Sequence, residues 1–338
     1  MNSSFAIWYK PREESGQEPN IELHINLWID EYKKDNVIDF GFMINNPQLV
    51  GSFYFFIPFN IENKNIQLLT ELLVEKPKLA NLVFNSDVTF GKKSEKIQEV
   101  TIKGINKEFY TPNYELLKKI DDIDLEYGKL LEFEFTSDLS KDPKYIRFRI
   151  QDLSNNSLVV YNERAASYLS GVSNTLVHFG VNINEYRKLP NEVNKSAKDS
   201  FINIKRIDMF VMADIGMEYM FSSIEEVDSR LLETKDWKDY NERLEDQGDI
   251  LAYHYVKKAK KEGEKTTYLK NFTIFNKFNH EKVKSQYIAL SVIFLTGYIG
   301  SLLSTINISV VFVISFIFGA MIIFIICPDF PFIKNKAK

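Results

Sequence analysis

The sequence predicts an α+β, mainly β soluble body, built as a sandwich or a partly closed barrel, followed by a C-terminal two-helix transmembrane hairpin. Two observations predict this organisation. Alternating apolar and polar residues recur along residues 1–255, which is the pattern of half-buried strands. Between Lys284 and Asp329 the chain then has 44 residues without a charge, although charged residues make up 26% of the whole.

The strand pattern is clearest near the N-terminus. One face of that strand carries Ile21, Leu23, Ile25, Leu27 and Ile29, and the other carries Glu22, His24, Asn26 and Trp28. Similar runs occupy residues 37–44, 51–59, 96–104, 130–137, 144–153, 157–162, 174–183 and 202–213. We therefore expect many short strands and a β-rich core.

Helical spacing appears in two places. In residues 65–76, Ile66, Leu69 and Leu73 form an apolar stripe. Residues 223–244 begin with acidic side chains, which favour the N-terminal turns of a helix. We expect a helix in each segment.

The uncharged run is about twice the length needed to cross a bilayer once. It breaks at residues 304–307, which leaves possible spans at 287–303 and 308–327. Lysines flank both ends, and positive residues remain on the cytoplasmic side. The start of the chain shows no signal-peptide pattern. We expect two spans in a bacterial inner membrane, with the body and the tail at 329–338 in the cytoplasm.

The body is acidic and the segment before the spans is basic. Residues 1–255 carry 30 Lys and Arg against 42 Asp and Glu, which argues against nucleic-acid binding. Residues 256–284 carry nine lysines against three glutamates. We call this segment the collar. It is expected to contact the anionic lipid surface, or else to be a solvated loop. Its candidate membrane-surface residues are Lys257, Lys258, Lys260, Lys261 and Lys265.

Secondary structure within the collar is open between a strand and an interfacial helix, and its apolar residues favour a strand. Residues 137–144 and 188–200 are polar and could each divide the body into two subdomains, or could be long loops. The hairpin also has pairs of small residues at helical spacing, which let helices approach closely in lipid. They pack the two helices of one hairpin together, or join protomers into a homo-oligomer. These residues are Gly297, Gly300, Ser301, Ser304, Ser315 and Gly319.

Motifs for catalysis are missing from the sequence. The single cysteine, Cys327, lies in the apolar tail, and the four histidines are far apart in the chain. No phosphate-binding glycine loop or nucleophile motif occurs. We expect no metal site, no cofactor and no enzymatic activity.

One pair of side chains suggests a ligand. Arg147 and Arg149 alternate with Ile146, Phe148 and Ile150, so both arginines point away from the apolar face. Two arginines can bind a phosphate through paired hydrogen bonds. The alternative is an exposed face of a sheet that binds nothing.

In its architecture the chain resembles the membrane effectors of bacterial anti-phage systems. The hairpin, the collar and the motif-poor body carry this resemblance. It implies a cytoplasmic domain that senses a ligand or a co-encoded partner protein, and hairpins that assemble in the lipid bilayer to disrupt the inner membrane. A membrane-tethered scaffold or receptor is the alternative, and a membrane-bound enzyme of unrecognised type is the third hypothesis.

Overall fold

The computed structural model describes residues 3–13, 17–120, 123–135, 140–151, 153, 158–167, 172–198, 200–225, 228–246, 248–283 and 286–303. They fall into two compact units, one made of Met1–Tyr161 and Val177–Phe278, the other of Asn162–Leu176 and Asn279–Lys338. Among the described residues, the second unit contains the ends of three strands and helix α5 (Gln286–Leu303). The first unit contains the sheets and helices that form the pocket described below.

A ten-stranded sheet is the centre of the first unit. Its central strands β2 and β16 run parallel to each other, as do β13 and β8. In spatial order the strands are β18 (Asp228–Leu232), β19 (Ile250–Lys258), β16 (Asn203–Asp214), β2 (Asn20–Trp28), β3 (Val37–Asn45), β13 (Lys144–Ile150), β8 (Ile105–Tyr110), β7 (Ile97–Ile102) and β6 (Val88–Lys93), with β5 (Ile66–Leu68) beside β13.

Smaller sheets accompany the large one. One has the order β1 (Ala6–Pro11), β4 (Val50–Ile57), β12 (Lys129–Glu134) and β9 (Tyr114–Leu117). Another has the order β14 (Val159–Ser167), β15 (Val172–Ile183), β22 (Phe272–Val283) and β17 (Met217–Ser222). Two-stranded ribbons pair β10 (Lys119–Ile120) with β11 (Ile123–Asp124), and β20 (Lys260–Glu262) with β21 (Lys265–Thr267).

The main core lies between the large sheet and the smaller sheets. Alternation places one side chain in two on each face of a strand, and the apolar set of β2 faces inward. Phe148 on β13 packs there against Phe42, Phe55 and Phe133, with ring centroids 5.4–5.8 Å apart. The first unit is therefore a β-sandwich with an aromatic core.

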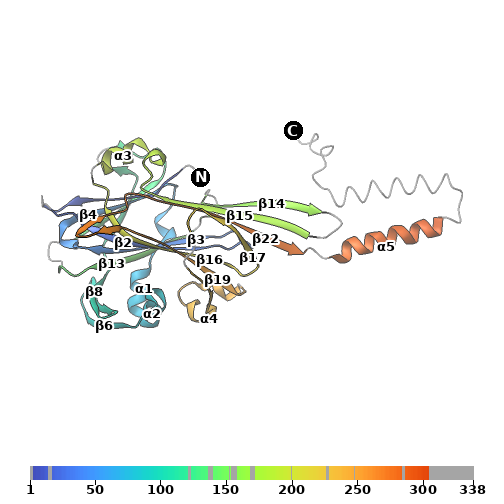
Figure 1. The fold of residues 1–338 in the computed structure, drawn as a ribbon, viewed down its shortest axis with the longest axis horizontal. Helices are drawn as coiled ribbons and strands as arrows, with labels where there is room; N and C mark the ends of the chain where they lie inside the picture. The colour runs from blue at the N-terminus through green and yellow to red at the C-terminus, as the bar shows by residue number, and fades with distance from the viewer. Residues whose placement is uncertain are drawn as a thin grey trace. The chain divides into compact units, whose positions relative to one another are not determined.

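Helices cover the outer faces of this sandwich (Figure 1). Helices α1 (Leu69–Glu75), α2 (Pro77–Phe84) and α4 (Thr234–Trp237) pack on the large sheet through a second apolar cluster. Helix α3 (Asn191–Ala197) packs on the outer face of the β1–β4 sheet through a third. The layers are α3, small sheet, large sheet, and then α1, α2 and α4.

The helix predicted over residues 223–244 is wrong. Part of that segment is strand β18, which pairs antiparallel with β19, and the only α-helix described within it is the four-residue α4. Leu232 and Trp237 are buried against the outer face of the large sheet. Hydrogen bonding at the sheet edge and this burial outweigh the local helical pattern.

The predicted transmembrane hairpin and the two-span inner-membrane location are also overturned. Across the described residues we find no helix whose length and apolar character would let it cross a bilayer. Helix α5 covers the first predicted span, but its 18 residues extend about 27 Å, less than the roughly 30 Å of a hydrocarbon core. The second predicted span, 308–327, lies outside the described residues.

Candidate functional site

A pocket of about 360 Å³ opens on the helical side of the large sheet. Strands β2, β16 and β19 form its floor, and the C-terminal end of α2, the β7–β8 turn, β18 and α4 form its walls. Its volume lies at the lower end of the range found for small-molecule sites. All of these elements belong to the first unit.

The floor is built from rows of side chains on neighbouring strands. Because β2 and β16 are parallel and in register, Glu22 lies beside Arg206, and His24 lies beside Asp208. On the next strand His254 pairs with Phe210 of β16, and the two rings stack with centroids 4.2 Å apart. Alternation directs these side chains to the pocket and their neighbours to the aromatic core.

Two arginines share one carboxylate beneath the pocket. Arg149 donates to both Asp39 oxygens, from Nε at 2.6 Å and from Nη2 at 3.0 Å. Arg147 Nη2 lies 3.8 Å from the same carboxylate. Trp28 and Tyr240 also donate to Asp39, at 3.0 and 2.8 Å. Burial raises the pKa of Asp39, but the two arginines and the Trp28 hydrogen bond outweigh it, and the net pKa is lowered.

Arg147 is held by neutral partners. Its Nε donates to the Tyr240 hydroxyl at 2.6 Å and its Nη1 to the Tyr145 hydroxyl at 2.8 Å. With its amide oxygen turned toward Arg147, Asn26 accepts from Nη2 at 2.7 Å. Burial raises the pKa of both tyrosines, so neither supplies a negative charge. Of the five guanidinium N–H groups, two have no hydrogen bond in the described structure.

Gly41 has no side chain, and this leaves room for His24 to join the same network. Gly41 of β3 lies between His24 of β2 and Arg147 of β13. A Cβ on Gly41 would lie within 3.0 Å of Tyr145 and Arg147 atoms, so only glycine leaves room for them. Across this gap the Tyr145 hydroxyl lies 3.2 Å from His24 Nδ1.

His24 is a neutral hydrogen-bond donor. Burial lowers the pKa of His24 to about 4. The charge of Asp208 opposes this shift, and the charge of Arg147 adds to it. The Tyr145 hydroxyl, which accepts from Arg147, lies within hydrogen-bonding distance of His24 Nδ1, and the neutral ring lines the pocket.

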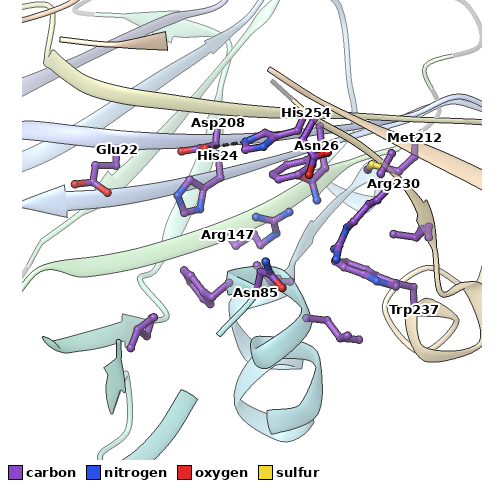
Figure 2. A pocket seen from close by; sticks show the side chains of 18 of the residues that line it. Glu22, His24, Asn26, Asn85, Arg147, Asp208, Met212, Arg230, Trp237 and His254 are labelled. Atoms are coloured by element: carbon purple, nitrogen blue, oxygen red, sulfur yellow. Dashed lines mark hydrogen bonds and ion pairs between the residues drawn. The ribbon is translucent and has the colours of Figure 1, made fainter. Parts of the chain in front are cut away.

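A second polar cluster lies beside His24. Asp208 accepts from Arg206 Nη2 at 2.6 Å and also from Arg206 Nε. It lies 2.9 Å from His254 Nε2 (Figure 2). Burial raises the pKa of Asp208, but these partners outweigh it and hold the pKa well below its usual range. The charge of Asp208 is therefore balanced within the cluster.

Three other cationic side chains of the pocket have no carboxylate bound to them. Lys103, Lys107 and Arg230 line it, and none of these three side chains has a hydrogen bond or ion pair with another described residue. Burial lowers the pKa of Lys107, while Glu22 opposes this shift. Glu22 itself binds Lys205 at 2.9 Å, so its charge is largely neutralised. Five cationic side chains and three carboxylates line the pocket.

The two arginines singled out in the sequence have different positions. Both are buried on the helical face of the large sheet, with Arg147 1% exposed, so the expectation of an exposed face is wrong. Arg147 lines the pocket and Arg149 does not, because Asp39 and the Tyr240 carbonyl bind the Arg149 guanidinium. The two side chains therefore do not form a phosphate clamp together.

The remaining predicted site residues are not among those that line the pocket. Gly297, Gly300 and Ser301 are exposed on α5, and Ser304, Ser315 and Gly319 lie outside the described residues. The collar lysines are exposed and occupy strands β19, β20 and β21. The rest of the collar includes β22, where Phe272, Ile274 and Phe278 are buried.

Sequence reasoning missed most of the pocket. His24 and Trp28 stood on the polar face of the first strand, which was the available signal, but nothing local linked them to Asp208 or His254. The four histidines are far apart in the chain, yet His24 and His254 line one pocket. In the part of the chain that the structure describes, no three His, Cys, Asp or Glu side chains are grouped to hold a metal ion.

Comparisons with known proteins leave the chain without a family. No protein-family model and no curated protein matches it. Among solved structures, yeast LTA4 hydrolase in complex with bestatin is similar with a TM-score of 0.30 and 8% identity, over 79% of this chain and 31% of that chain. This likeness is too weak to carry an argument. The resemblance to anti-phage effectors receives no support from these comparisons.

Proposed function

We propose that the first unit is a ligand-sensing module whose pocket binds a small anionic molecule, with a phosphate as the preferred group. The observation that carries the proposal is the charge beneath the pocket. Two buried guanidinium groups share the single carboxylate of Asp39, which leaves an excess positive charge next to Arg147. Arg147 shares its counter-charge with Arg149, and an anion in the pocket would supply a second negative charge.

The side chains above Arg147 support the same ligand class. Lys107 and the neutral His24 supply donors on one side of the pocket, and Arg147 has unused N–H groups on the floor. Two of the three carboxylates that line the pocket, Glu22 and Asp208, are paired with Lys205 and Arg206, and the third is Asp228. Phosphate has three or four oxygens that can accept from several donors at once, which suits this arrangement.

Calorimetric titration with inorganic phosphate tests the proposal. The wild-type protein is expected to bind phosphate, with an affinity that falls as the salt concentration rises. Lys107→Gln is expected to weaken binding about tenfold, because a charge-assisted hydrogen bond contributes on the order of 1.5 kcal/mol.

Lys78→Gln is the matched control, because Lys78 is an exposed residue of α2 that does not line the pocket. Its affinity for phosphate should equal that of the wild type. The proposal fails if phosphate binding is undetectable at millimolar concentration, or if both substitutions weaken it equally.

A further inference from the structure

Among the described strands, β6 and β18 form the two edges of the ten-stranded sheet. An edge strand presents unpaired backbone N–H and C=O groups, and proteins commonly block such an edge with lysines or a bulge. Strand β6 has both features, because its register with β7 shifts between Phe90 and Lys93, and because Lys92 and Lys93 are exposed. These features disfavour association of β6 with another strand.

Strand β18 has neither a bulge nor a lysine. Its five residues pair with β19 in unbroken antiparallel register. No described strand pairs with its other side. Asp228, Ser229 and Leu231 are exposed there. The free side of β18 is therefore open to another strand.

The face of β18 that turns away from the pocket is apolar at this edge. Leu231 is 51% exposed, and its neighbour across the strand pair is the partly buried Leu251 of β19. On the same face, Tyr253 of β19 stacks on Tyr219 of β17, which is 39% exposed. Large apolar side chains along an unpaired strand edge are typical of a surface that another chain covers.

The pocket face of β18 carries one acidic and one basic side chain. Asp228 and Arg230 are two residues apart, so both project from this face and line the pocket. Neither side chain has a hydrogen bond or ion pair with another described residue. In an antiparallel pair of two identical β18 strands centred on Ser229, Asp228 of each copy lies opposite Arg230 of the other. Opposite charges at opposed positions stabilise such a pair.

We propose that the protein forms a homodimer in which β18 pairs antiparallel with β18 of a second copy, with the two-fold axis at Ser229. The two ten-stranded sheets become one continuous sheet, and two ion pairs between Asp228 and Arg230 fix the register. A pair centred on Arg230 would instead oppose two like charges. The dimer supplies a cation to Asp228, the one pocket carboxylate that binds none among the described residues, and it does not require a ligand in the pocket.

Charge reversal tests the dimer, with sedimentation equilibrium of the whole chain as the measurement. The wild type is expected to dimerise, with a dissociation constant that rises with salt concentration. Arg230→Asp opposes carboxylates and Asp228→Arg opposes guanidinium groups, so each is expected to weaken the dimer by a factor of about ten or more. Lys78→Asp, a reversal of the same size at an exposed position of α2, is the matched control and should dimerise as the wild type does.

Combining the two reversals separates loss of pairing from loss of folding. The double variant Asp228→Arg/Arg230→Asp restores opposite charges at both positions, and so does a mixture of the two single variants. Both are expected to recover the wild-type dissociation constant, which unfolded single variants could not do in the mixture. A monomeric wild type, single variants that dimerise as the wild type does, or a mixture that stays monomeric would each overturn the inference.

A cysteine cross-link locates the interface. In a Cys327→Ser background, Ser229→Cys places two thiols opposite each other on the dimer axis, at a separation that a disulfide can bridge. Mild oxidation with diamide is expected to give a covalent dimer. Thr89→Cys, at an exposed position of the other edge strand β6, is the control and should stay unlinked. Equal cross-linking of the two variants, or none in Ser229→Cys, would overturn the inference.

Discussion

Arg149 donates two hydrogen bonds to the Asp39 carboxylate, at 2.6 and 3.0 Å, whereas Arg147 on the same strand lies 3.8 Å from that carboxylate. The charge of Arg149 is therefore closely balanced by Asp39, whereas the charge of Arg147, beneath the pocket, is balanced less closely. The first contact is structural. The second leaves a buried cation available to a ligand.

Substituting the two arginines by methionine should separate these roles. Arg149→Met leaves Asp39 without its close partner, and we expect a loss of about 3–5 kcal/mol in the free energy of unfolding. Arg147→Met leaves Tyr145, Tyr240 and Asn26 each without one hydrogen bond, and we expect a smaller loss, about 1–3 kcal/mol, together with loss of phosphate binding. Urea denaturation measures the first quantity. Equal destabilisation by the two substitutions would contradict the assignment.

Gly41 should be required for the pocket. Gly41→Ala places a methyl group 2.3 Å from the present position of the Tyr145 hydroxyl, so the side chain of Tyr145 must move. That movement breaks the bridge from Arg147 to His24, and we expect weaker phosphate binding and a lower melting temperature. Gly51→Ala is the control, because its Cβ would lie no closer than 3.4 Å to any atom. Unchanged phosphate affinity in Gly41→Ala would count against the network.

Acid should destabilise the protein through His24. Its pKa is 6.5 in the unfolded chain and about 4 in the folded protein. Both forms are neutral above pH 6.5, so His24 then has no effect on stability. As the pH falls from 6.5 to 4 the unfolded chain binds the proton first, and about 3 kcal/mol is lost by the time both forms are protonated.

His24→Gln removes this titration. In urea denaturation series at pH 7.5, 6, 5 and 4.5, the wild type should lose more stability than His24→Gln between successive points. Parallel curves for the two proteins would show that His24 titrates normally in the folded state.

Phosphate binding should weaken at alkaline pH. Burial lowers the pKa of Lys107, and only its charged form attracts an anion. Affinity is therefore expected to be retained below that lowered pKa and lost as the pH rises through it. Lys107→Arg keeps the charge at all these pH values and should flatten the profile. An identical decline in both proteins would assign the pH effect to another group.

The sequence predicts the strands better than the site. Alternation along β2 identifies both its core face and the face that later proves to line the pocket. What places His24 beside Asp208 is the parallel pairing of β2 with β16, and no local pattern encodes a contact over so long a separation. The same holds for Arg149 and Asp39, which are 110 residues apart.

Local patterns also mislead where tertiary contacts decide. Residues 228–232 have a helical character that the pairing of β18 with β19 overrides. Arg147 and Arg149 look like an exposed pair on one face of a strand, because the sequence does not show that α1, α2 and α4 cover that face. Both arginines are buried under these helices, where Arg149 binds Asp39 and Arg147 lines the pocket.

A crystal structure of the protein with ribose 5-phosphate tests the central claim most directly. We expect the phosphate in this pocket, with its oxygens within hydrogen-bonding distance of Lys107 Nζ and of the unused N–H groups of Arg147. The absence of phosphate density there at a concentration that saturates binding in solution, or its presence on another surface, would contradict the account.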